Sequence, residues 1–143
     1  MNIVAIGDVH GCITKLQEKV QPLIGSQSEV VFLGDLIDRS PEENGDLRVL
    51  QLIHFMEQNP QAFGLKSVTV LTGNHEQAFL QAYDGDDSEL WSINGGNPEL
   101  LYKHVHSLTG CVLVLRTTSL VNTYLCTLVC ALTCLWRSKP NEI

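Results

Sequence analysis

Along the first eighty positions of the chain, two patterns of apolar residues alternate. Short β-branched runs, typical of buried strands, occupy residues 2–6, 29–35 and 67–74. Between them, apolar residues recur every three or four positions over residues 13–23 and 47–56, which predicts amphipathic helices, the second ending before Asn59 and Pro60. This order of strand, helix, strand, helix, strand predicts an α/β fold with a mostly parallel sheet.

All three predicted strands end in the same way. Each runs through a glycine into polar residues, in the segments IGDVHG, LGDLIDR and LTGNHE. In open α/β sheets, ligands bind just outside the carboxyl ends of the strands, so we expect these three tails to meet in one crevice. Gly7, Gly34 and Gly73 would let the backbone turn sharply there without side-chain bulk.

The three tails carry side chains that suit metal ions. Asp8, His10, Asp35 and Asn74 supply two carboxylates, an imidazole and an amide oxygen, a mostly hard donor set that suits manganese, iron or zinc. Two cations about 3.5–4 Å apart can clamp a phosphate and acidify a shared water. Taken singly, Asp8 is explained as a turn residue and Asn74 as a helix cap. Three such motifs in one chain favour a dinuclear metal site instead.

The motifs GDVHG, GDLIDR and GNHE, in this order and spacing, resemble the signature of calcineurin-like metallophosphoesterases, in particular the serine/threonine phosphoprotein phosphatase branch. WSINGG, at residues 91–96, resembles the bacterial branch, which includes small protein phosphatases and symmetrical diadenosine tetraphosphate hydrolases. The resemblance covers about residues 2–106. It implies the N-terminal half of a β-sandwich flanked by helices, and hydrolysis of phosphoserine, phosphothreonine or dinucleoside polyphosphates by a metal-bound hydroxide.

The resemblance also implies a role for each donor in the tails. It assigns Asp8 and His10 to a first divalent ion, Asp35 to a bridging position and Asn74 to a second ion. Manganese is the favoured metal, with iron or zinc as alternatives.

The same resemblance implies which residues move protons and bind phosphate. His75 would protonate the leaving oxygen, Asp38 would orient its ring, and Arg39 would bind the phosphate. The ordinary alternative for Arg39 is a surface ion pair with one of the neighbouring glutamates. Glu76 is expected to be structural, and His54 to be an ordinary helix residue.

The later part of the chain departs from the family pattern. Ser40 stands where the family usually has glycine, so the turn behind Arg39 could be altered. The family uses two further histidine ligands from later segments, but no histidine follows residue 106. His104 and His106 precede the expected later strands. A catalytically inactive, truncated remnant that lacks two metal-ligand histidines is therefore the alternative to an active phosphoesterase.

Composition changes after residue 106. Residues 107–143 hold four of the five cysteines, which we expect to be plain thiols, and 20 uncharged residues run from Thr117 to Trp136. A membrane span is one explanation, but a shifted reading frame is favoured, because a neighbouring frame can encode the family's missing VHAG strand end. We predict a metallophosphoesterase half at residues 1–106 and a frameshifted tail at residues 107–143, which the coding DNA tests.

The charge balance narrows the class of partner. Sixteen acidic residues against nine basic ones give a net charge of −7, which disfavours nucleic acid and anionic membranes. A phosphorylated protein or a dinucleoside polyphosphate is the expected substrate. The segment MNIVAIGDVHG lacks the pattern of a signal peptide, which predicts a cytoplasmic protein.

Overall fold

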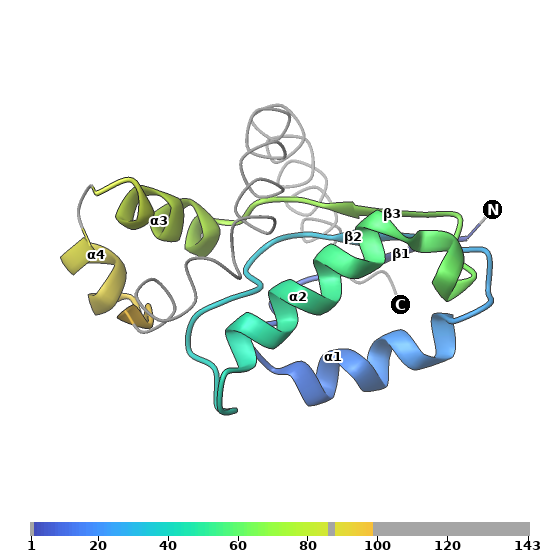
Figure 1. Ribbon diagram of the computed structural model, residues 1–143, viewed down its shortest axis with the longest axis horizontal. Helices are drawn as coiled ribbons and strands as arrows, with labels where there is room; N and C mark the ends of the chain where they lie inside the picture. Colours follow the sequence, from blue (N-terminus) through green and yellow to red (C-terminus); the bar gives the residue numbers. More distant parts are fainter. Residues whose placement is uncertain (1, 86–87, 99–143) are drawn as a thin grey trace, which may run out of the picture.

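The structure is a computed structural model of the chain, and it describes residues 2–85 and 88–98 (Figure 1). The predicted tail, the possible span within it, and His104 and His106 all lie outside these residues. The boundary after residue 106 therefore stays a prediction. Cys12, the one cysteine among the described residues, is a free thiol.

Three parallel strands form the sheet, in the order β1, β2, β3 (Figure 1). Their bounds are β1 (Ile3–Ile6), β2 (Glu29–Phe32) and β3 (Ser67–Val70). The last residues of the three strands are paired in register, so all three tails leave the sheet at the same level. The predicted mostly parallel α/β sheet is confirmed. Strands β2 and β3 end at Phe32 and Val70, which is earlier than the predicted ends at residues 35 and 74.

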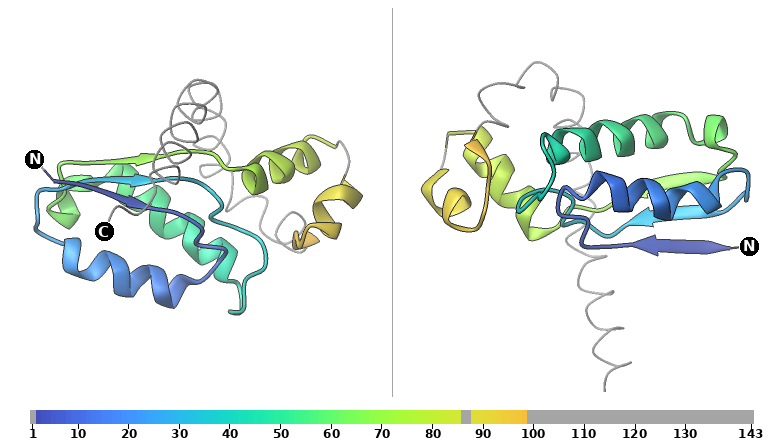
Figure 2. Two further views of the ribbon diagram at one scale, coloured as in Figure 1. Left: turned by 180° about the vertical axis from the view of Figure 1, so that it is seen from behind. Right: turned by 90° about the horizontal axis from the view of Figure 1, so that it is seen from below.

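Two helices, α1 (Ile13–Val20) and α2 (Gly45–Gln58), cover the same face of the sheet (Figure 2). Helix α2 ends before Asn59, as predicted. Helix α1 is shorter than predicted, because the chain continues from residue 21 as a 3-10 turn, η1 (Gln21–Leu23). Pro22 explains the change, since its ring clashes with the preceding helical turn and it has no N–H to donate.

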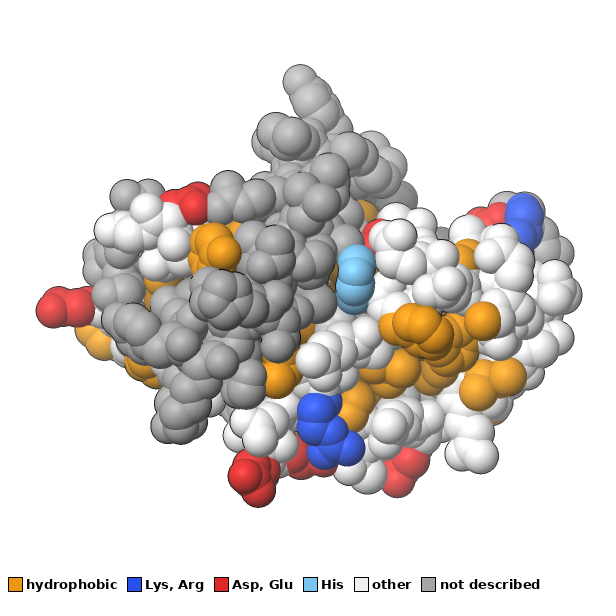
Figure 3. Space-filling view, in the orientation of Figure 1, with side chains coloured by type: hydrophobic (Ala, Val, Ile, Leu, Met, Phe, Trp, Pro, Cys, Tyr) orange, Lys and Arg blue, Asp and Glu red, His pale blue; other side chains and the backbone are white. Residues whose placement is uncertain are grey.

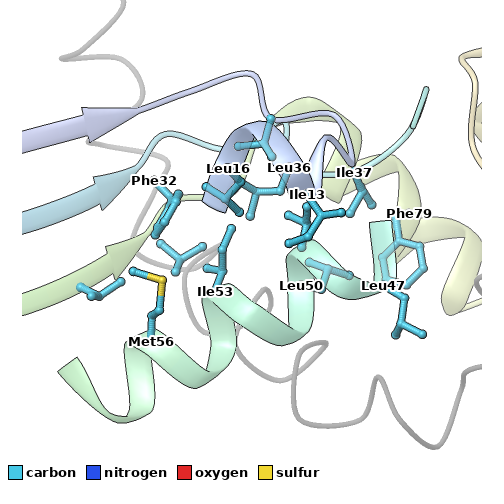
Figure 4. Packing of buried hydrophobic residues seen from close by; sticks show 14 of the residues in the cluster. Ile13, Leu16, Phe32, Leu36, Ile37, Leu47, Leu50, Ile53, Met56 and Phe79 are labelled. Carbon is cyan, nitrogen blue, oxygen red and sulfur yellow. The ribbon is translucent and has the colours of Figure 1, made fainter. Parts of the chain in front are cut away.

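The hydrophobic core lies between this face of the sheet and the two helices. Figure 4 shows Phe32 from β2 close to Ile53 and Met56 from α2, with Leu16 from α1 beside them. All four side chains are at most 3 % exposed. Burying each one stabilises the fold by about 1.5–3 kcal/mol, so the core fixes the sheet and, with it, the origin of each tail.

Helices α3 (Asn74–Tyr83) and α4 (Ser88–Ile93) lie beyond the carboxyl ends of the strands and pack on each other (Figure 1). Trp91 of α4 is buried, and its ring centroid is 5.6 Å from that of Phe79 in α3. None of the described helices is long and apolar enough to cross a membrane. These two helices place the WSINGG segment beside the strand tails.

The second face of the sheet carries no described helix, and Ile3 on β1 is 62 % exposed. A second sheet does not occur in residues 2–85 and 88–98, so the β-sandwich stays a prediction. On the helical side, exposed apolar side chains gather toward the ends of α1 and α2 (Figure 3), where Ile24 and Phe55 are each 55 % exposed. That end of the molecule is remote from the strand tails.

Candidate active site

The strand tails turn through an unusual backbone conformation. The φ angle is positive at Asp8 (51°), His10 (45°), Asp35 (53°), Asp38 (69°) and Arg39 (60°). The left-handed region is uncommon for residues other than glycine and costs about 1–3 kcal/mol at each position. All five are candidate site residues, and of the three glycines expected to allow the turns only Gly34 has a positive φ. Other contacts must hold these turns in place.

Glu76 supplies the main link between the tails of β2 and β3. Its side chain is fully buried, and its carboxylate accepts four backbone N–H bonds, from Asp35 (2.8 Å), Leu36 (2.7 Å), Ile37 (3.3 Å) and Gly73 (2.8 Å). Burial raises the pKa of Glu76, while the N–H groups of Leu36, Gly73 and Asp35 act to lower it. Glu76 therefore has a structural role, as predicted, because it links the backbones of the two tails.

The tail of β1 joins the tail of β2 through its backbone. His10 N–H donates to the carbonyl of Asp35 (3.0 Å), and Gly11 N–H donates to that of Leu36 (2.8 Å). His10 Nδ1 lies 3.0 Å from the carbonyl oxygen of Ile37. Because a carbonyl only accepts, Nδ1 carries the proton and Nε2 keeps its lone pair, the arrangement usual for a metal-ligating histidine.

A buried Asp–His pair stands next to His10. His75 Nδ1 lies 2.8 Å from Asp38 Oδ2, and the indole N–H of Trp91 donates to both Asp38 oxygens, at 3.1 and 3.0 Å. The ring centroids of His10 and His75 are 4.9 Å apart. Burial raises the pKa of Asp38, while the hydrogen bonds from His75 and Trp91 act to lower it. No role was predicted for Trp91 from the sequence, although the WSINGG segment that contains it was the available signal.

The other candidate metal ligands, Asp35, Asp8 and Asn74, make fewer contacts with the Asp38–His75 pair. His75 N–H lies 3.4 Å from Asp35 Oδ1, and a side chain at Gly73 would collide with that oxygen, since its Cβ would lie 2.3 Å away. Asp8 and Asn74 are exposed. Asn74 is the first residue of α3 and Gly73 precedes the helix, so the alternative in which Asn74 caps the helix is wrong.

Arg39 lies at the edge of the site. Its backbone N–H donates to the carbonyl of Gly95 and its Nε to that of Asn94, both at 3.3 Å. Within the described part of the chain it forms no ion pair, and Glu42 instead accepts from the N–H and hydroxyl of Thr14 (3.1 and 2.6 Å). The surface-pair alternative for Arg39 is therefore wrong. The side chain is exposed and joins the GDLIDR tail to the WSINGG segment.

Ser40 does not disrupt the turn behind Arg39. It is not among the residues with positive φ, so the position does not require glycine. Its hydroxyl lies 3.0 Å from the carbonyl of Gly11, to which it donates, and accepts from Glu42 N–H (3.2 Å). Ser40 thereby ties the GDLIDR tail to the GDVHG tail.

The three strand tails carry the kinds of donor atom that bind divalent ions. They combine carboxylates with an imidazole whose Nε2 is free, which suits hard or borderline cations. Among residues 2–85 and 88–98, however, no three His, Cys, Asp or Glu side chains gather closely enough to hold an ion. The donors fit the ion, but the described residues do not close a coordination shell.

Comparison with known proteins identifies the family. The sequence profile of the calcineurin-like phosphoesterases matches residues 1–130, which is most of the chain. The chain belongs to the calcineurin-like phosphoesterase family. The resemblance carried by GDVHG, GDLIDR and GNHE is thus confirmed. Members of this family are hydrolases that typically bind two metal ions.

Relatives of the chain include bacterial phosphatases. The chain is 34% identical over 94 residues to serine/threonine-protein phosphatase 1 of Salmonella typhimurium, covering 64% of this chain and 38% of that protein. For serine/threonine-protein phosphatase 2 of Escherichia coli the identity is 31% over 98 residues, covering 67% and 39%. A symmetrical bis(5'-nucleosyl)-tetraphosphatase of Janthinobacterium is 33% identical over 82 residues, covering 56% and 26%. The chain therefore spans about two fifths of the phosphatases and a quarter of the tetraphosphatase.

A buried acid behind the site should make stability depend on pH. Asp46, in the first turn of α2, is 4 % exposed, and burial, followed by the charge of Asp38, raises its pKa from 3.8 to about 6. Between these values the folded protein binds more protons than the unfolded chain, so stability falls as pH rises from about 4 to about 6. After screening is allowed for, the loss is roughly 1–2 kcal/mol.

Urea unfolding of the metal-free protein at several pH values measures this loss. We expect the free energy of unfolding of Asp46→Asn to fall less steeply over that interval than that of the wild type. Parallel curves for the two proteins would show that Asp46 has an ordinary pKa.

Proposed function

We propose that the chain is a metal-dependent phosphoesterase that hydrolyses phosphomonoesters, of the phosphoserine and phosphothreonine protein phosphatase type. The observation that supports this most strongly is the buried Asp38–His75 pair, in which Nδ1 of His75 lies 2.8 Å from Oδ2 of Asp38. This pair lies beside His10, at the carboxyl ends of three strands that are paired in register. A positioned imidazole next to oxygen and nitrogen donors is what phosphate ester hydrolysis requires.

The residues that would hold the ions come from all three tails. We assign Asp8 and His10 to one ion, Asn74 to a second, and Asp35 to a position shared by both. When bound, such ions polarise phosphoryl oxygens and lower the pKa of water. Manganese is the metal we favour, and iron and zinc suit the same donors.

The protein's own residues handle the leaving group. In its protonated form, His75 donates from Nδ1 to Asp38, which leaves the Nε2 proton for the leaving oxygen of the ester. Trp91 holds the Asp38 carboxylate from the other side, so the imidazole ring keeps one orientation. Arg39 would bind the phosphoryl oxygens through its guanidinium, while its Nε remains on the WSINGG segment.

The proposed substrate class rests on the relatives that match the chain. Phosphoproteins are our first proposal, because serine/threonine-protein phosphatases are among the relatives at 31–34% identity. Dinucleoside polyphosphates are the second, because symmetrical tetraphosphatases match the same part of the chain. Release of phosphate from a phosphoserine peptide, compared with hydrolysis of diadenosine tetraphosphate under the same conditions, separates the two.

A non-catalytic remnant is the competing function. One observation favours it: the donors of the described residues do not close a metal shell. Loss of ligands weakens metal binding and leaves the water poorly placed. Under this alternative the chain would neither take up manganese nor turn over substrate.

Turnover of p-nitrophenyl phosphate with manganese tests the proposal. We expect His75→Asn to lower kcat by about 100- to 10,000-fold, the range for loss of a general acid. His54→Asn is the matched control, since His54 lies in α2 away from the tails, and its kcat should equal that of the wild type. Absence of both turnover and manganese uptake in the wild-type chain would favour the remnant.

A further inference from the structure

A cavity of about 230 Å³ opens next to Asp8, where the end of β1 faces helix α1. Strand β1 is an outer strand of the sheet, so the cavity lies at the sheet edge (Figure 2). Asp8 itself belongs to the lining. Because Asp8 is a candidate metal ligand, the cavity adjoins the candidate active site.

The lining combines an apolar wall with two cations. Ile6, Val9 and Leu16 provide the wall, and Lys15 and Lys19 provide the cations. The two lysines are four residues apart on α1, so their side chains leave the helix on the same side. Both are exposed, so their carbon stems can line the cavity while the ammonium groups stay at its mouth.

The two lysines are available to bind an anion. Neither forms an ion pair with an acid in residues 2–85 and 88–98. Glu42 interacts with Lys15 through charge, but hydrogen bonds from Thr14 lower the pKa of Glu42 more than Lys15 does. Two cations without ion-pair partners at one cavity run against the net charge of −7 and favour an anionic ligand there.

The size of the cavity limits which anion fits. Sites for drug-sized ligands are about 300–1,000 Å³, so this cavity has room for one side chain rather than for a nucleoside. A bare inorganic anion would leave the apolar wall without contacts. The side chain of glutamate or aspartate suits both parts of the lining, because it has a methylene stem for the wall and a carboxylate for the lysines.

We propose that this cavity is a specificity subsite for an acidic side chain next to the phosphorylated residue of a peptide substrate, with Lys15 and Lys19 binding its carboxylate. The proposal rests on the proposed phosphatase function, which places the phosphate at the neighbouring strand tails. Occupation of the subsite can be observed without turnover, so failure of one can be told from failure of the other.

Cys12 reports occupation of the subsite, because its half-buried free thiol belongs to the lining. Two phosphoserine peptides are compared, one with glutamates on both sides of the phosphoserine and one with glutamines there. Alkylation of Cys12 by iodoacetamide is followed by mass spectrometry of the digested protein. The peptide concentration that halves the alkylation rate should be about 3- to 10-fold lower for the glutamate peptide, the effect of two exposed charge pairs.

Lysine variants test whether charge causes this preference. Lys15→Gln combined with Lys19→Gln should remove it, whereas Lys15→Arg combined with Lys19→Arg should keep it. Lys66→Gln is the matched control, because Lys66 is an exposed lysine that precedes β3 at the opposite end of the sheet. It should leave the preference intact. Equal protection of Cys12 by the two peptides, no protection by either, or a preference that persists in the double glutamine variant would overturn the proposal.

Where the chain turns over substrate, kinetics separate the subsite from the phosphatase function. The glutamate peptide should have the higher kcat/KM through a lower KM, and its advantage should shrink in about 0.5 M salt, which screens exposed charges. Equal kcat/KM values for the two peptides would overturn the subsite and leave the phosphatase function standing. Selective protection of Cys12 by the glutamate peptide, without hydrolysis of either peptide, would support the subsite and count against the phosphatase function alone.

Discussion

Replacing Asp35 with asparagine should reduce manganese affinity by about 1,000-fold, equivalent to about 4 kcal/mol. Asp35 is the proposed shared ligand, so its loss removes a negatively charged donor from both ions. Asparagine keeps the shape of the side chain, including an oxygen near His75 N–H, which lies 3.4 Å from Asp35 Oδ1. A drop in affinity would therefore report lost charge rather than a lost fold.

Isothermal titration calorimetry measures this change directly. Asp84→Asn is the control, because Asp84 is exposed and follows the last residue of α3. Its manganese affinity should match that of the wild type. If both variants bind as tightly as the wild type, Asp35 is not a ligand.

Replacing Glu76 with leucine should destabilise the fold by at least 4 kcal/mol. The change removes the acceptor of four backbone N–H groups, and an unsatisfied buried donor costs about 1–3 kcal/mol. The tails of β2 and β3 would also lose their shared anchor, so their left-handed turns would lack support. Thermal and urea unfolding give the size of the effect.

Glu57→Leu is the comparison for this variant. Glu57 is half-buried, and one of its carboxylate oxygens is buried without a hydrogen-bond partner, so its loss should be close to neutral or stabilising. A Glu76→Leu protein that is no less stable than Glu57→Leu would show that the four N–H bonds do not hold the site together.

The sequence predicted the elements that depend on local periodicity. Runs ending at Gly7, Gly34 and Gly73 became parallel strands that stop in register, because each apolar run is followed by a glycine and polar residues. The helix at α1 was predicted too long, because the apolar spacing continues through Leu23, while Pro22 prevents a regular helix there. The strands β2 and β3 were also predicted too long, because the predicted ranges included the polar tails.

Contacts between distant residues could not be read from periodicity. Trp91 and Asp38 are 53 positions apart, and only packing of α4 on α3 brings the indole to the carboxylate. The buried position of Asp46 likewise depends on where α2 starts relative to the tails. The left-handed turns at Asp35 and Asp38 were missed for the same reason, since bonds from distant side chains stabilise them.

The residues of the three motifs were predicted in part: the sequence indicated their chemistry, but not how they are arranged in space. The expected contact of Asp38 with His75 is present, and His10 has its Nε2 free. The metal assignments remain proposals, because donor type follows from sequence but closure of a coordination shell depends on the arrangement of residues from several segments. Within the described residues that closure is not seen.

Paramagnetic broadening by manganese tests most directly whether the three strand ends form a metal centre. Manganese added to the labelled wild-type chain should broaden the ring signals of His10 and His75 first and leave those of His54 sharp. The same titration of Asp35→Asn should leave all three sharp at equal metal concentration. Equal broadening of His54 and His10, or no difference between the two proteins, would contradict a metal centre at the strand ends.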